Sequence, residues 1–281
     1  MSPWRLAARR FARNRPAVRG AGLVVLLALA ALLAPWLTAD PLAQPDPVRL
    51  QDRPPSLAHP LGTDPFSRDV LSRTLHGARV SLVVGTGAAL LAVTLGAGMG
   101  LVAGLAGRRT DQLLMRGVDV AMALPRILLL LAVFAVWEDA PAAAVVVLIA
   151  ATGWFQTSRI VRAAVLSLRE AEFVVAARAL GAPAPGIVRR HLLPHVAAPV
   201  IVSASLDVGN IILLEAGLSY LGLGVRPPTP TWGNMIMDGK DVLLTAPWVA
   251  LAPGLALVVT VVAFNLAADG LRDALDPRMA A

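Results

Sequence analysis

The sequence has 281 residues, of which 57% are hydrophobic and 15% are charged, with no cysteine and a formal net charge of +7. This composition is too apolar for a soluble domain, and because the basic residues do not form one patch with interleaved aromatic residues, it does not indicate a nucleic-acid-binding protein. The absence of cysteine excludes disulfides and cysteine-based metal sites, and the single lysine, Lys240, precedes Asp241, which excludes a Gly-Lys-Ser/Thr phosphate loop.

The N-terminal part predicts a membrane span with a cytoplasmic flank. Residues 1–19 contain six arginines and no acidic residue, and residues 20–37 contain no charge. A basic flank before an apolar segment is retained in the cytoplasm. The alternative is a cleaved export signal, and Arg9, Arg10 and Phe11 resemble a twin-arginine pattern. However, the apolar run is longer than the roughly 7–15 residues of such a signal, and further spans follow.

Residues 38–79 form a polar, proline-rich segment between the first two spans. Five aspartates are balanced by five arginines, which predicts a loop on the outer side of the membrane. Within this loop, Asp64 is expected to cap a short helix whose first residue is Pro65.

The second span, residues 80–106, is rich in glycine and alanine, so neighbouring helices can approach it closely. Glycine at every fourth position places Gly96, Gly100 and Gly104 on nearly one face. We interpret this face as a packing surface and not as a binding site.

The third span is interrupted by polar residues. Asp119 and Arg126 leave only residues 127–137 uniformly apolar, which is fewer than the about 20 residues that a straight crossing needs. Pro125 is expected to kink the helix. A tight outer turn at residues 138–141 then leads into a fourth span at residues 142–155.

The charged segment of residues 167–194 lies between two apolar blocks, so it must fold in water. Ser167 and Glu170 have the spacing of a capping box at the start of a helix, and Gly181 marks the end of that helix. A second short helix is expected from Pro185 to just before Pro194. The apolar face of the first helix is expected to consist of Phe173, Val174, Ala177 and Leu180, and the cations available to a partner are Arg178, Arg189 and Arg190.

The fifth span, residues 197–223, contains Asp207, Asn210 and Glu215. Ionisable groups at membrane depth are costly unless they face a partner or a watery cavity. Helical spacing puts the three residues on roughly one side. They therefore either line a translocation path or form interhelical hydrogen bonds.

The last third of the chain predicts an outer loop and a sixth span. Residues 218–233 contain several prolines and Trp232, which predicts a stiff loop with an interfacial anchor, and residues 248–267 form the span. Of the 25 basic residues, 18 fall in residues 1–19, 108–126 and 159–190 and in the C-terminal tail, and 7 fall in the two long outer loops. Six spans with both termini in the cytoplasm satisfy this asymmetry.

Four separated segments, in the same order, resemble one family. The spacing of Ala176-Ala177, Gly181 and Leu193-Pro194 resembles the cytoplasmic loop of ATP-binding-cassette (ABC) importer permeases, although Val175 replaces the family's Glu and His191 replaces its Ile. The other three segments resemble the dipeptide, oligopeptide and nickel permeases, with Ser67 where that group has Gly; they are residues 59–82, 218–233 and 269–278. An ordinary amphipathic loop would explain the first segment alone.

The resemblance implies a type I ABC importer fold in the inner membrane. Residues 1–77 would form the N-terminal tail, first span and outer loop, and residues 78–281 a five-helix core with a coupling loop at 158–196. The implied partners are a second homologous permease, an extracytoplasmic solute-binding protein and two cytoplasmic ATPases that bind ATP and magnesium, so this chain needs no cofactor or ATPase site. The implied solutes are di- or oligopeptides, or a small solute such as nickel. The residues expected to couple to the ATPases are Phe173, Ala176, Ala177, Arg178, Gly181, Arg189, Leu193 and Pro194.

Two other functions are compatible with the same residues. A secondary transporter driven by an ion gradient would use Asp207 and Glu215 as ion carriers, but no inverted repeat with paired broken helices is visible in the sequence. An intramembrane enzyme would need a nucleophile or a metal. His191 and His195 are four residues apart, but Pro194 is expected to break the helix that would bring them together.

Overall fold

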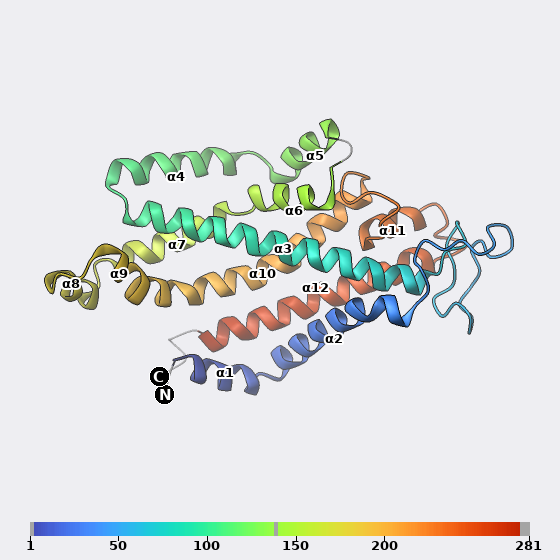
Figure 1. Ribbon diagram of the computed structural model, residues 1–281, viewed down its shortest axis with the longest axis horizontal. Helices are drawn as coiled ribbons and strands as arrows, with labels where there is room; N and C mark the ends of the chain where they lie inside the picture. The colour runs from blue at the N-terminus through green and yellow to red at the C-terminus, as the bar shows by residue number, and fades with distance from the viewer. Residues whose placement is uncertain (1–2, 138–139, 276–281) are drawn as a thin grey trace.

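Figure 1 shows the computed structural model of the chain, which describes residues 3–137 and 140–275. These residues form helices and loops and no named strand. Four helices within the described residues are long and apolar enough to cross a membrane: α2 (Arg15–Leu37), α3 (Val70–Leu105), the continuous helix Ala184–Tyr220 that ends in α10 (Leu193–Tyr220), and α12 (Trp248–Leu275). The expected all-α polytopic fold is confirmed. Residues 138–139 of the expected turn and 276–278 of the tail lie outside the described residues.

Two further crossings are bent pairs, which brings the described spans to six when each pair counts as one. Helices α4 (Arg108–Ala123) and α5 (Arg126–Val136) meet at 76°, and α6 (Ala142–Ala151) and α7 (Phe155–Leu168) meet at 44°. The first break falls at Pro125, which has no backbone N–H and restricts the residue before it. Pro125 therefore breaks the third span instead of only kinking it.

Helix α3 starts ten residues earlier than expected, because Asp69 caps it. The Asp69 carboxylate accepts a hydrogen bond from the Ser72 N–H at 2.7 Å. The expectation that Asp64 caps a helix is wrong. Its Oδ1 accepts from the N–H groups of Phe66 and Arg68, both at 2.9 Å, and these bonds close a turn before the helix begins.

The glycine face of α3 is a packing surface, as expected. A Cβ atom added at Gly96 would lie 2.6 Å from the carbonyl oxygen of Trp154, and one at Gly100 would lie 2.5 Å from that of Ser158. Only glycine allows this approach, so α3 and α7 pack backbone to backbone.

The helices run lengthwise, so the molecule has two ends (Figure 1). At one end lie α1 (Pro3–Arg13), the end of α12, and the segment with α8 (Glu172–Ala179) and α9 (Ala184–Ile187); we call it the hairpin end. At the other lie residues 38–69 and α11 (Trp232–Gly239), which form the loop end. The segments with the most basic residues thus share one end.

Trp232 is not an interfacial anchor, which corrects the sequence expectation. A capping box between Thr231 and Asn234 starts α11 at this residue and turns the indole into the protein. The ring is fully buried, and its Nε1–H donates to the carbonyl oxygen of Thr74 at 3.1 Å. Trp232 therefore joins α11 to α3.

Four charges, of which Asp238 is half-buried and the others are buried, hold the loop end together, and we call them the loop-end ion cluster: Asp64, Arg68, Arg73 and Asp238. The Asp64 Oδ2 atom lies 2.6 Å from the Nε of Arg68 and 3.6 Å from that of Arg73. Both guanidinium groups also reach Asp238, at 3.0 and 3.2 Å. The cluster fastens the loop to the start of α3 and to α11.

Candidate functional site

The segment of residues 167–194 folds into a compact structure that we call the hairpin. Its first helix does not begin at a capping box, as the sequence suggested. Ser167 remains inside α7, which continues to Leu168, and α8 begins at Glu172 without a side-chain cap from any described residue. The capping-box expectation is wrong because the residue that precedes α8 is Ala171, four residues later than the Ser167 cap that the spacing implied.

Gly181 ends α8 as expected. Its φ of +78° is in the left-handed region, where glycine has no steric penalty. The Ala182 N–H donates to the Ala177 carbonyl at 3.0 Å, and the Gly181 N–H donates to that of Arg178 at 2.9 Å. This is a Schellman motif, and it reverses the chain toward α9.

The hairpin is fixed to two membrane helices by an apolar core of its own. Val174, Ile187 and Leu192 are buried against Val161 and Val165 of α7, and Val196 of α10 completes the cluster. Closely packed apolar side chains transmit displacement. A movement of the hairpin therefore displaces α7 and α10.

The outward side of the hairpin presents apolar and cationic groups. Leu180 is 88% exposed and Val175 is 52% exposed, so the expected apolar face of α8 is divided between the core and the surface. Phe173 stacks on His195 with ring centroids 5.1 Å apart, and it also lies near His191. Of the residues expected to contact ATPases, Ala177 is half-buried and the others are exposed: Phe173, Ala176, Arg178, Gly181, Arg189, Leu193 and Pro194.

The second hairpin helix does not end before Pro194, which is a correction. After α9, a π turn at Val188–Leu192 continues directly into α10, and Pro194 lies in the first turn of that helix. The Leu193 N–H donates to the Val188 carbonyl, five residues back. This longer hydrogen-bond spacing carries the helix past a residue that has no N–H.

The expectation that Pro194 keeps His191 and His195 apart by breaking the helix is wrong. Because the helix continues through Pro194, the His195 Nδ1 lies 2.6 Å from the carbonyl oxygen of His191. The described residues contain no group of three or more His, Cys, Asp or Glu side chains able to hold a metal ion.

Glu215 lies in an interhelical hydrogen-bond cluster on α10. It is fully buried, and it accepts from the hydroxyls of Ser219 at 2.7 Å and Ser81 at 3.3 Å. Those hydroxyls in turn accept from the N–H groups of Val225 and Trp232. The carboxyl therefore connects α10 to α3, to the following loop and to α11.

Asp207 and Asn210 have different surroundings from Glu215. Asn210 is exposed on the surface of α10, whereas Asp207 is partly buried and lines a cavity opposite Arg126. The Arg126 guanidinium donates to the Ile149 carbonyl at 2.7 Å and to the Thr152 hydroxyl at 3.2 Å. No local pattern in the sequence brings Arg126 and Asp207 together, because the two residues are 81 positions apart.

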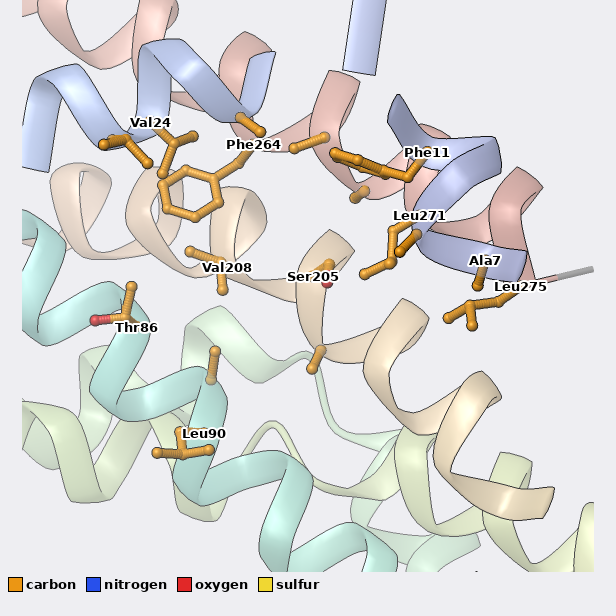
Figure 2. A pocket seen from close by; sticks show the side chains of 17 residues that line it. Ala7, Phe11, Val24, Thr86, Leu90, Ser205, Val208, Phe264, Leu271 and Leu275 are labelled. Carbon is orange, nitrogen blue, oxygen red and sulfur yellow. The ribbon is translucent and has the colours of Figure 1, made fainter. Parts of the chain in front are cut away.

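A larger, apolar groove lies between α1, α2, α3, α10 and α12 (Figure 2). Its volume is about 810 Å³. Phe11, Val24, Phe264 and Leu271 project into it, and apart from the hydroxyls of Thr86 and Ser205 its described lining residues have apolar side chains. This surface matches apolar groups, and it offers no charge to an ionised solute.

The sequence comparisons agree with this architecture. Residues 96–281 match the family described as binding-protein-dependent transport system inner membrane component, and residues 2–55 match the N-terminal transmembrane domain of oligopeptide transport permease C. The chain belongs to this family of permeases. The permease is 42% identical to the dipeptide transport system permease protein DppC of Alkalihalophilus pseudofirmus, across 99% of its own length and 91% of that protein. It is 43% identical to a Brucella abortus protein with the provisional name of peptide transport system permease, across 99% and 93% of the two chains.

Family membership confirms the resemblance seen in the sequence. The permease has the type I ABC importer fold and is an inner-membrane protein. Members of this family are transport subunits, and they are not themselves the ATPases.

Proposed function

We propose that this permease is one transmembrane half of an ATP-driven importer for di- or oligopeptides. The proposed complex also contains a second related permease, two cytoplasmic ATPases that bind ATP and magnesium, and an extracytoplasmic solute-binding protein. The hairpin and both termini face the cytoplasm in this arrangement. The peptide specificity is supported by the names of the relatives and by the match to an oligopeptide permease domain.

The coupling role is supported by one observation: the hairpin has one side that is buried against the membrane helices and one side that is exposed. Its buried side, with Val174 and Leu192, is packed on α7 and α10, and its other side exposes Leu180 and Arg178. An ATPase that binds the exposed side and then closes against its partner would displace both helices as one body. Such a displacement can switch access to the path from one side of the membrane to the other.

Single cysteines test this arrangement directly, because the natural chain has none. Leu180→Cys places one thiol on the hairpin, and Leu57→Cys places one on a fully exposed residue of the loop end. We expect a membrane-impermeant maleimide to label Leu57→Cys in intact cells and Leu180→Cys only in inside-out vesicles. We also expect Leu180→Cys, and not Leu57→Cys, to cross-link to an ATPase in the assembled complex. Labelling of Leu180→Cys from outside would overturn the proposal.

A charge reversal tests the coupling step. Arg178→Glu is expected to reduce ATP-driven peptide uptake by about tenfold, while the amount of permease in the membrane stays unchanged. Arg109→Glu makes the same charge change at an exposed position of α4, and it is expected to leave uptake as it was. Equal uptake by the two variants would contradict a contact at Arg178.

A further inference from the structure

A cavity with four polar side chains in its mainly apolar lining lies where both bent spans break beside α10. Its volume is about 330 Å³, and it is lined by residues between 121 and 129, by residues between 152 and 156, and by Asp207. Asp207 is fourteen residues from Leu193 and thirteen from Tyr220, so it lies midway along α10. The cavity is therefore at membrane depth.

The two breaks are held together by one side chain. Irregular backbone at membrane depth is tolerated only where it is buried in protein or lines a watery cavity. Arg126, the first residue of α5, donates to the Ile149 carbonyl of α6 and to the hydroxyl of Thr152, which follows α6. These bonds use two of the five N–H donors of a guanidinium, so the group is fixed in the wall and still has donors to offer.

The lining of this cavity also carries the opposite charge. Asp207 interacts electrostatically with Arg126, and among the described residues its carboxylate has no direct hydrogen bond or ion pair. Gln156 adds an amide to the same cavity. A charge at this depth is costly unless a partner or water meets it, so a cavity with both signs is suited to a ligand with both signs.

Size and charge together limit the class of ligand. The volume lies near the lower end of the about 300–1,000 Å³ of small-molecule pockets. The apolar groove of Figure 2 is larger, but it presents no charge. A short peptide with ionised ends has an ammonium and a carboxylate separated by a compact backbone, which matches a cavity lined by one cationic and one anionic side chain.

We propose that this cavity is a binding site for the two ionised ends of a short peptide during its passage. The Arg126 guanidinium binds the peptide carboxylate, and the Asp207 carboxylate binds the ammonium group. This inference rests on the proposed function, because it names the part of the permease that contacts the solute directly.

The binding test uses the complete importer in vesicles and the dipeptide alanyl-photoleucine as the probe. Illumination during turnover is expected to attach the probe to residues 121–129 and 152–156 of the permease, and mass spectrometry locates the attachment. In Asp207→Asn the labelling of these segments is expected to fall about tenfold, whereas Ser205→Ala, on the groove side of α10, keeps it. Labelling that is confined to other segments, or that is equal in Asp207→Asn, would overturn the site.

The transport test separates this site from the proposed function. Asp207→Asn and Arg126→Gln are expected to lower the number of peptides imported per ATP about tenfold, while the loaded binding protein still stimulates ATP hydrolysis. Arg126→Lys keeps the charge and is expected to recover part of the uptake. Normal uptake in Asp207→Asn and Arg126→Gln would reject the site and leave the importer assignment intact. Absence of ATP-driven dipeptide uptake in the unaltered complex would reject the assignment itself.

Discussion

The loop end and the hairpin end differ in the interactions that their side chains make within the chain. At the loop end, Asp64 and its three partners are paired within the chain, and Glu215 accepts two hydroxyl hydrogen bonds from other parts of the same chain. At the hairpin end, Leu180 and Val175 are apolar and largely exposed. The charged side chains of the loop-end ion cluster are thus paired within the chain, whereas both ends expose apolar side chains, among them Leu57 at the loop end.

This difference shows where the molecule is expected to be stiff and where it is expected to bind. Buried charges of opposite sign fix each other's geometry, because separating them leaves a charge without solvent. Exposed apolar side chains contribute little to the isolated fold, and they gain energy only when another surface covers them. The substitutions below test this contrast, from the largest expected effect to the smallest.

Asp64→Ala is expected to cause the largest loss. It leaves the guanidinium groups of Arg68 and Arg73 with only Asp238, and it removes the acceptor that closes the turn before α3. Breaking a buried ion pair costs about 3–5 kcal/mol. Thermal unfolding of the purified permease measures the loss, and Asp241→Ala, at an exposed position, serves as the control. A loss below about 1 kcal/mol would mean that charges do not hold the loop end.

Gly181→Ala is expected to have a smaller and more local effect. An alanine in the left-handed conformation costs about 1–2 kcal/mol, so the Schellman motif should open more often. Hydrogen exchange at the amides of α8 measures this opening. Gly186→Ala is the matched control, because its added Cβ meets the nearest atom at an ordinary 3.6 Å. If Gly181→Ala destabilises the whole fold as much as Asp64→Ala, the two ends are not as different as we infer.

Asp52→Asn is expected to give the smallest change, and it is a gain. Burial and the nearby Asp64 charge raise the pKa of Asp52 above its ordinary value of 3.8. Ionised Asp52 therefore destabilises the fold, and this penalty is present at pH 7 and disappears as pH falls through that pKa. Asparagine also accepts the φ of 50° at this position. We expect a gain below about 0.5 kcal/mol at pH 7 that shrinks toward pH 4, measured by unfolding. A gain that is independent of pH would exclude this explanation.

The sequence predicts those features that depend on local spacing. The apolar runs predicted the spans, the interval of four between Gly96 and Gly100 predicted a packing face, and Gly181 predicted the turn in the hairpin. Each of these follows from the period of one helix or from one backbone conformation. The hairpin motif together with three further segments in the same order was also sufficient to indicate the family.

The features that the sequence did not predict depend on how distant segments meet. Arg126 and Asp207 share a cavity because two spans bend by amounts that no local pattern specifies. Pro194 suggested the end of a helix, but a π turn before it keeps the helix continuous. Trp232 had the residue type of an interfacial anchor, and only the position of α3 reveals why its indole is buried.

The continuous helix from Ala184 to Tyr220 has a mechanical consequence. At about 1.5 Å per residue, its 37 residues extend about 55 Å, well beyond the about 30 Å of hydrocarbon in a bilayer. One continuous helix thus reaches from the hairpin core to the junction at Glu215. A displacement at the hairpin end of this helix would therefore reach the residues around Glu215 through a single continuous element.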